Sequence, residues 1–140
     1  MKRIGLSLIV LMFSLFSYAQ SDVIGTWKTI DDETGKEKST VKIYKGTNGK
    51  YYGKIIDLTN PKKKNGVCDK CEGEKKNKPL MGMRIIEGLE KDGTDYSGGT
   101  ITNPEDGEVY SCTIWREGNT LKVRGYIGWF YKTQTWIKVS

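Results

Sequence analysis

The sequence predicts an all-β protein, folded as an eight-stranded antiparallel up-and-down barrel. After residue 20, no window of the chain sustains the apolar period of a helix. Short segments rich in Tyr, Trp, Thr, Ile and Val alternate instead with clusters of Gly, Asn, Asp and Pro, which favour turns. Eight such segments joined mostly by tight turns favour a barrel, because closing the sheet removes its exposed edges.

The turn clusters divide the chain into its predicted strands. We expect strands at residues 23–30, 39–45, 51–58, 82–90, 95–103, 108–117, 120–127 and 132–139. The longest connection spans residues 59–80. An eight-stranded barrel has an interior that side chains just fill or that holds one small ligand, and both outcomes stay open at this point.

The dipeptide Gly118-Asn119 sets the register of one hairpin. As a two-residue turn it pairs Glu117 with Thr120. The pairs that follow sort into two faces, because successive side chains alternate across a sheet. The predicted apolar face holds Ile114 with Val123, Cys112 with Gly125, and Tyr110 with Ile127; the other face holds Thr113 with Arg124, Trp115 with Lys122, and Ser111 with Tyr126.

Two further hairpins are predicted from their turns. A four-residue turn at positions 104–107 (Pro-Glu-Asp-Gly) continues the apolar face across a third strand. A three-residue loop at positions 47–49 joins the second and third strands. The resulting pairs are Ile101 with Tyr110, Gly99 with Cys112, Ile43 with Gly53, and Val41 with Ile55.

The first nineteen residues have the pattern of a secretory signal peptide. Lys2 and Arg3 precede an apolar stretch, and Ser17 and Ala19 place small residues where a signal peptidase reads. The apolar stretch is short for a bilayer span. We therefore expect an exported chain, periplasmic or secreted, with residues 20–140 forming one barrel domain without a membrane span.

An ordered set of short motifs runs along the whole predicted domain. It begins with Gly25-x-Trp27, Gly53-x-Ile55 and residues 79–82 (Pro-Leu-Met-Gly), continues through residues 98–110, and ends with residues 121–128 and Thr135-Trp136. This set resembles the bacterial family called domain of unknown function 2147. The resemblance implies an exported lipocalin-like or streptavidin-like barrel, and it implies no established activity.

The lipocalin likeness also implies a partner for the first-strand tryptophan. In such barrels this Trp packs against an Arg near the end of the barrel, and Arg124 is the matching candidate for Trp27. The hairpin register places Arg124 on the polar face, so the contact would lie outside the wall or would not form.

The connection at residues 59–80 is strongly basic. Its seven lysines against three acidic residues give it a charge of +4, which equals the net charge of the chain after residue 19. It is either a cationic lid or arm for anionic groups or a solvated loop that aids solubility. Its candidate ligand-contacting lysines are Lys62, Lys63, Lys64 and Lys70. Nucleic acid is a poor partner because the loop lacks aromatic residues for base stacking.

The same loop contains the pair Cys68 and Cys71. Export favours a disulfide between them. A redox motif and a metal site are alternatives, but the thioredoxin-like setting is missing and the chain has no histidine. Cys112 lies on the predicted apolar face and is expected to be a small buried side chain.

Catalysis is not predicted. Without histidine, the usual Ser-His and Cys-His nucleophile arrangements are excluded, and the acidic pairs lie in turns. Asp57, near the end of the third strand, is the one acid retained as a candidate. No enzyme activity, cofactor or metal is expected.

The aromatic residues suggest a binding module for a small apolar or amphiphilic ligand, including an anionic one. Trp27, Tyr110 and Trp136 are predicted to be interior. Tyr126 and Trp129 belong to an aromatic group around a turn at 128–132, which lines a barrel mouth, forms a contact patch or caps the core. The alternative is a non-catalytic structural protein with a filled barrel that docks on an envelope protein.

Overall fold

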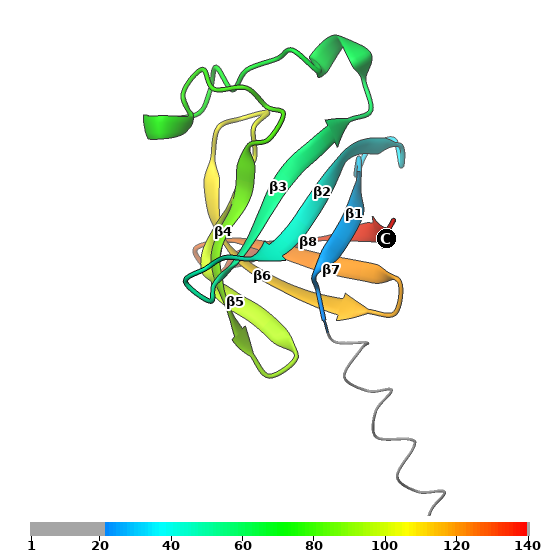
Figure 1. The fold of residues 1–140 in the computed structure, drawn as a ribbon, viewed down its shortest axis with the longest axis vertical. Coiled ribbons are helices and arrows are strands. Elements are labelled where there is room, and N and C mark those ends of the chain that lie inside the picture. Colours follow the sequence, from blue (N-terminus) through cyan, green and yellow to red (C-terminus); the bar gives the residue numbers. More distant parts are fainter. Residues whose placement is uncertain (1–21, 140) are drawn as a thin grey trace, which may run out of the picture.

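The computed structural model describes residues 22–139, and the predicted signal peptide lies outside them. Eight antiparallel strands form one closed barrel in sequence order, with the last strand paired to the first (Figure 1). The strands are β1 (Gly25–Ile30), β2 (Glu37–Lys45), β3 (Tyr51–Leu58), β4 (Arg84–Asp92), β5 (Asp95–Thr102), β6 (Val109–Glu117), β7 (Thr120–Ile127) and β8 (Phe130–Lys138). The predicted fold class is confirmed.

The predicted registers are also confirmed. Glu117 pairs with Thr120 across the β6–β7 turn, and Ile114 pairs with Val123. The pairs of Ile101 with Tyr110 and of Ile43 with Gly53 have the predicted partners as well. The expected pair of Tyr110 with Ile127 does not form, because the β6–β7 ladder ends one pair earlier, at Ser111 and Tyr126.

The aromatic turn predicted at residues 128–132 is wrong in its length. Only Gly128 and Trp129 form the turn, since Ile127 already pairs with Phe130. Gly128 has a φ of 58°, in the left-handed region that favours glycine at such a turn. Phe130 and Tyr131 are therefore the first residues of β8, and the hairpin is longer than predicted.

Large apolar side chains fill most of the barrel. Each fully buried side chain of this kind contributes roughly 1.5–3 kcal/mol through the hydrophobic effect. The largest of them within the barrel are Trp27, Trp136, Tyr96, Ile43, Ile86, Leu89, Ile114, Leu121, Val23 and Val41. The free thiol of Cys112 is buried among them, as predicted.

Gly99 allows the backbones of β4 and β5 to approach each other closely in the barrel wall. A Cβ atom built on Gly99 would lie 2.1 Å from the carbonyl oxygen of Glu87 in β4. No side chain fits at that distance. The packing of β4 against β5 therefore depends on glycine at this position.

The two ends of the barrel differ. The connections β1–β2, β3–β4, β5–β6 and β7–β8 all lie at one end, which we call the loop end; Figure 1 shows the long β3–β4 loop there. The other end is closed by residues before β1. The indole Nε1 of Trp27 donates to Val23 O at 2.9 Å, and Arg116 Nη1 donates to Asp22 O at 3.1 Å. The Arg116 guanidinium lies 5.6 Å from the Trp27 ring centre.

The barrel closes through a short seam. β1 and β8 share only two residue pairs, Trp27 with Lys138 and Lys28 with Ile137. The neighbouring β7–β8 ladder has eight pairs. Both seam pairs lie toward the closed end, so β1 and β8 are not paired at the loop end.

Candidate functional site

The inward-facing side chains at the loop end form a partly exposed layer. Ile101, Tyr110, Gly125 and Gln134 contribute to it from β5, β6, β7 and β8. A Cβ atom built on Gly125 would lie 3.5 Å from Tyr110 Cβ and 3.8 Å from Ile101 Cγ2, which are ordinary contact distances. A Cβ atom therefore fits here, unlike at Gly99. We call this layer the mouth.

Below the mouth the interior is closed. Cys112, Val123 and Trp136 are each one inward position further from the loop end on β6, β7 and β8, and each is at most 2% exposed. The indole Nε1 of Trp136 donates to Gln134 Oε1 at 3.2 Å. Trp136 therefore belongs to the floor of the mouth, and its polar atom is satisfied by a mouth residue.

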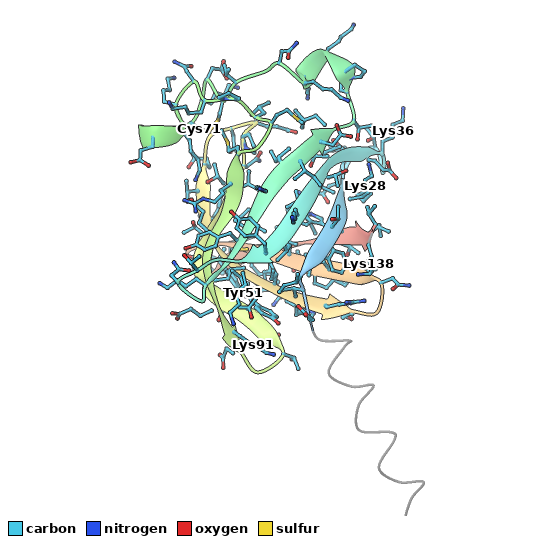
Figure 2. The ribbon with its side chains drawn as sticks, viewed as in Figure 1. Lys28, Lys36, Tyr51, Cys71, Lys91 and Lys138 are labelled. Atoms are coloured by element: carbon cyan, nitrogen blue, oxygen red, sulfur yellow. A yellow bond between two sulfur atoms is a disulfide. The ribbon has the colours of Figure 1, made fainter. Side chains whose placement is uncertain are left out.

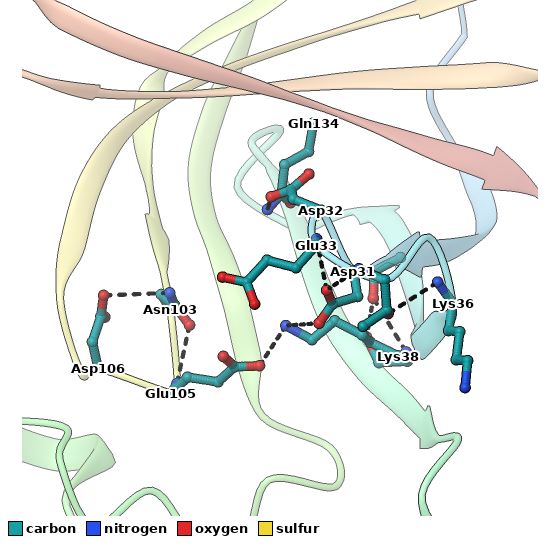
Figure 3. Close-up of polar contacts among 12 residues, drawn as sticks. Asp31, Asp32, Glu33, Lys36, Lys38, Asn103, Glu105, Asp106 and Gln134 are labelled. Atoms are coloured by element: carbon teal, nitrogen blue, oxygen red, sulfur yellow. Dashed lines mark hydrogen bonds and ion pairs between the residues drawn. The ribbon is translucent and has the colours of Figure 1, made fainter.

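The rim of the mouth carries a chain of polar contacts (Figure 3). Lys38 Nζ lies 4.0 Å from Asp31 Oδ2 and also forms an ion pair with Glu105 in the β5–β6 turn. β2 and the β5–β6 turn are not neighbours in the sheet. This ion pair therefore connects separate parts of the rim.

Asp31 organises the β1–β2 turn. Its Oδ1 accepts from the backbone N–H groups of Thr34 at 3.0 Å and Glu33 at 2.8 Å. These backbone hydrogen bonds, first that of Thr34, hold the pKa of Asp31 below its ordinary value of 3.8. The carboxylate is thus kept ionised beside Lys38.

Side chains bridge the unpaired part of the β1–β8 seam. Asp32 Oδ2 accepts from Gln134 Nε2 at 3.1 Å and lies 3.0 Å from Lys132 Nζ. Both partners come from β8, and Asp32 comes from the turn that follows β1. The rim thus presents ammonium and amide groups next to the mouth.

Tyr110 joins the mouth to the β5–β6 turn. Its hydroxyl donates to Asp106 Oδ2 at 3.1 Å. Burial, together with this hydrogen bond and the negative charge of Asp106, raises the pKa of Tyr110 above 10.0. Tyr110 therefore stays neutral at physiological pH and offers a ring face and an anchored hydroxyl.

The long β3–β4 loop is folded onto this end of the barrel. Cys68 and Cys71 form the predicted disulfide, and both are buried. Figure 2 shows Cys71 in the loop, on the other side of the molecule from Lys91. The ring rests on the β5–β6 turn: a Cβ atom on Gly107 would lie 1.9 Å from Lys70 O. The loop is therefore not a free arm in this structure.

Two open depressions lie outside the barrel wall, between the loop and β4 to β6. Their volumes are about 370 Å³ and about 550 Å³. Both are lined by Glu74, Lys75 and Glu87, and Lys75 Nζ forms an ion pair with Glu87 Oε2 at 2.7 Å. Charged side chains contribute to both depressions, and neither is lined by Ile101, Tyr110, Gly125 or Gln134.

Comparison with known proteins identifies the family. Residues 25–138 match the family described as "Uncharacterized protein conserved in bacteria (DUF2147)". The chain belongs to this family. A solved structure, protein HP1028 from Helicobacter pylori, which is described as belonging to the lipocalin family, is similar at 25% sequence identity. The similarity covers 85% of this chain and 84% of that chain, with a TM-score of 0.74. No curated protein matches.

The DUF2147 barrel does not bring together all the residues predicted to contact a ligand. Trp27 and Trp136 are buried in the packed interior, and Tyr110 lies at the mouth. Tyr126 lies on the outer face of β7, and Trp129 lies at the β7–β8 turn with 89% of its surface exposed. Only Tyr110, with Trp136 below it, remains associated with the mouth.

Arg124 does not pair with Trp27 in the DUF2147 barrel, which corrects the expectation taken from lipocalins. Its guanidinium lies 4.9 Å from the Trp115 ring centre and 4.2 Å from that of Tyr131, outside the wall. Arg116 occupies the expected place against Trp27. The register predicted for the β6–β7 hairpin had already placed Arg124 on the outer face. Alternation of side chains along β6 in the same register places Arg116 on the inner face.

Several site residues were missed by sequence reasoning. Gln134 lies opposite Val123 on the inner face, and a two-residue β7–β8 turn would have predicted this pairing. The contacts of Asp32 and Glu105 join turns that are distant in sequence, so no local pattern predicts them. Asp57, by contrast, was already a candidate from the sequence, and it pairs with Lys64 at 3.3 Å, at the start of the loop.

Within residues 22–139 of this DUF2147 protein, no group of three or more acidic, Cys or His side chains is arranged to hold a metal ion. In the same range, no helix has both the length and the apolar character needed to cross a membrane.

Proposed function

We propose that this chain is a binding module that takes a small amphiphilic ligand at the mouth. The observation that carries the proposal is the change of packing along the barrel, from a closed floor to a partly exposed layer ringed by charged groups. A ligand that buries an apolar part in this layer is stabilised, because its apolar surface and that of the mouth side chains are both removed from water.

The chemistry of the mouth favours an amphiphile with an anionic head. Ile101 and the ring of Tyr110, which lie next to Gly125, offer apolar contact. Gln134 and Lys132 offer an amide and an ammonium group on the β8 side. A carboxylate or phosphate head would compete with Asp32 for these donors.

The packed floor limits the size of the ligand. Trp27 and Trp136 fill the space below the mouth, so a long chain cannot enter the barrel without moving them. We therefore propose a ligand held at the rim and upper interior. In this proposal Trp136 forms the floor, and Trp27 stabilises the closed end.

A lipocalin-like barrel in a family without a known activity fits binding better than catalysis. We propose no catalytic residue. The signal-peptide pattern of residues 1–19 further supports a role outside the cytoplasm, in the periplasm or after secretion.

A fluorescent anionic amphiphile, 11-(dansylamino)undecanoic acid, tests the site. Wild-type protein should bind it, and Gly125→Leu, which fills the mouth, should weaken binding at least ten-fold. Ser111→Leu is the control, because it places the same leucine side chain on the exposed outer face of the neighbouring strand. Equal binding by wild type and Gly125→Leu would refute the mouth as the site.

A second candidate, a structural protein that docks on an envelope partner, is favoured by the solid lower barrel. Native mass spectrometry of protein purified from its own host separates the two. A co-purifying small molecule that Gly125→Leu loses supports binding at the mouth. A partner protein retained by Gly125→Leu, with no small molecule, supports the structural role.

A further inference from the structure

The β7–β8 hairpin ends in an exposed apolar tip that the mouth does not use. Ile127 and Phe130 are each 65% exposed, Trp129 is 89% exposed and Tyr131 is 55% exposed. We call these four residues the aromatic tip. The rings of Trp129 and Phe130 lie 5.1 Å apart and so form one continuous apolar surface. An exposed patch of this kind marks an interaction site.

The aromatic tip lies beyond the paired parts of both neighbouring strands. The β6–β7 ladder ends at Ser111 and Tyr126, and the β1–β8 ladder ends at Lys28 and Ile137. Because side chains alternate along a strand, Phe130 lies on one face of the hairpin and Tyr131 on the other. Trp129 lies at the turn between them. The tip is thus a finger with apolar groups on both faces and at its end.

The hairpin that carries this finger is cationic. Residues 120–138 include four basic residues, Lys122, Arg124, Lys132 and Lys138, and no acidic residue. Arg124 packs on Tyr131 at 4.2 Å, and Lys132 follows the aromatic tip directly. Arg124 therefore places positive charge just behind the apolar end, whereas Lys132 is paired with Asp32.

The lysine-rich loop lies at the same end of the molecule. The β3–β4 and β7–β8 connections both belong to the loop end of the barrel. Lys62, Lys63 and Lys70 are exposed in that loop. These ammonium groups add positive charge to the loop end, beside the acidic residues Asp31, Asp32 and Glu105 of the β1–β2 and β5–β6 turns, which pair with Lys38 and Lys132.

We propose that the aromatic tip inserts into the interface of an anionic lipid bilayer. Trp and Tyr rings favour the boundary between headgroups and acyl chains, and basic residues beside them attract anionic headgroups. The hairpin tip has apolar side chains on both faces, and a lipid layer into which it inserts contacts both faces. A flat protein surface would cover only one face.

Vesicle co-flotation tests this proposal with phosphatidylcholine vesicles that contain or lack 30% phosphatidylglycerol. Wild-type protein should bind the anionic vesicles more tightly, and added salt should weaken binding because it screens the headgroup charge. The double variant Trp129→Ser/Phe130→Ser should bind at least ten-fold more weakly. Circular dichroism of the variant should match that of wild type, since both side chains lie outside the core.

A matched control removes two exposed apolar side chains from the closed end. Ile24→Ser/Val139→Ser should bind the vesicles like wild type. Trp129→Phe keeps an aromatic ring at the turn, so it should still bind but lose most of the tryptophan quenching by brominated lipid. The other three tryptophans are buried or lie along the strands, away from the finger's end.

Three results would overturn the proposal: no binding to either vesicle at millimolar lipid, equal binding by wild type and the tip double variant, or full quenching of Trp129→Phe by brominated lipid. Binding of a purified envelope protein to the tip without vesicle binding would also overturn it in favour of a protein partner. Gly125→Leu changes the mouth and leaves the tip intact. It should therefore bind vesicles like wild type if the tip is the lipid-binding surface, and more weakly if the mouth is.

Discussion

At the scale of single residues, Cys112 shows how the barrel controls chemistry. Burial raises the pKa of its thiol to about 12, so the reactive thiolate is rare at neutral pH. We predict that native protein shows no thiol reactive toward Ellman's reagent at pH 8. Unreduced protein in denaturant should show one, because Cys68 and Cys71 are paired. Three thiols in denaturant would contradict the disulfide, and rapid reaction of native protein would contradict the burial.

Asp31 makes stability depend on acidic pH. Its folded pKa lies below the ordinary value of 3.8, so its stabilising contribution is present above 3.8 and is lost as the pH falls through the folded pKa. We predict that Asp31→Asn flattens the fall in unfolding free energy below pH 3.8, measured by urea melts. Glu33→Gln removes a charge from the same turn without these backbone hydrogen bonds and should keep more of the slope. Identical slopes in all three proteins would refute the assignment.

At the scale of elements, Gly107 is the point where the disulfide ring rests on the β5–β6 turn. Its φ is 75°, and an added Cβ would overlap Lys70 O. We predict that Gly107→Ala lowers the unfolding free energy by about 3 kcal/mol, from left-handed strain plus displacement of the loop. Gly118→Ala has a similar φ with open space around it and should cost about 1 kcal/mol. Equal losses in urea melts would show that the ring does not rest there.

The disulfide also determines how firmly the basic loop is held. Closing so short a ring stabilises by about 2 kcal/mol on the chain-entropy model. We predict that Cys68→Ser/Cys71→Ser accelerates tryptic cleavage between Lys62 and Lys78, followed by mass spectrometry. Cleavage at Lys50 in the β2–β3 turn is the internal control and should keep its rate. An unchanged rate of tryptic cleavage within the loop would mean that the ion pairs of Lys64 and Lys75 hold the loop without the disulfide.

At the scale of the whole molecule, the weakest wall should be the β1–β8 seam. Two residue pairs close it, whereas seven join β2 to β3. We predict that amides bonded across the seam, near Trp27 and Ile137, exchange hydrogen faster than those bonded within the β2–β3 ladder. Native-state hydrogen exchange followed by NMR measures both sets. Seam amides among the slowest in the protein would contradict this expectation.

The wall of the barrel could be predicted from the sequence because turns such as Gly118-Asn119 fix a register locally. Alternation then assigned Ile114 and Cys112 to the interior. The mouth could not be predicted in the same way. Its rim depends on contacts such as Lys38 with Glu105 and Asp32 with Gln134, which join turns distant in sequence. The exposed tip was misplaced because Trp129-Phe130-Tyr131 was interpreted as a turn, although two of these residues extend a strand.

The short seam has a consequence for how the chain assembles itself. Its two strands come from opposite ends of the described chain, so joining them carries the largest loop-closure entropy of any strand pair and should be the last step of folding. Until that step the sheet is an open ribbon with two free edges. Two such ribbons at high concentration can exchange their final strands, so a domain-swapped dimer is the expected by-product of crowded refolding.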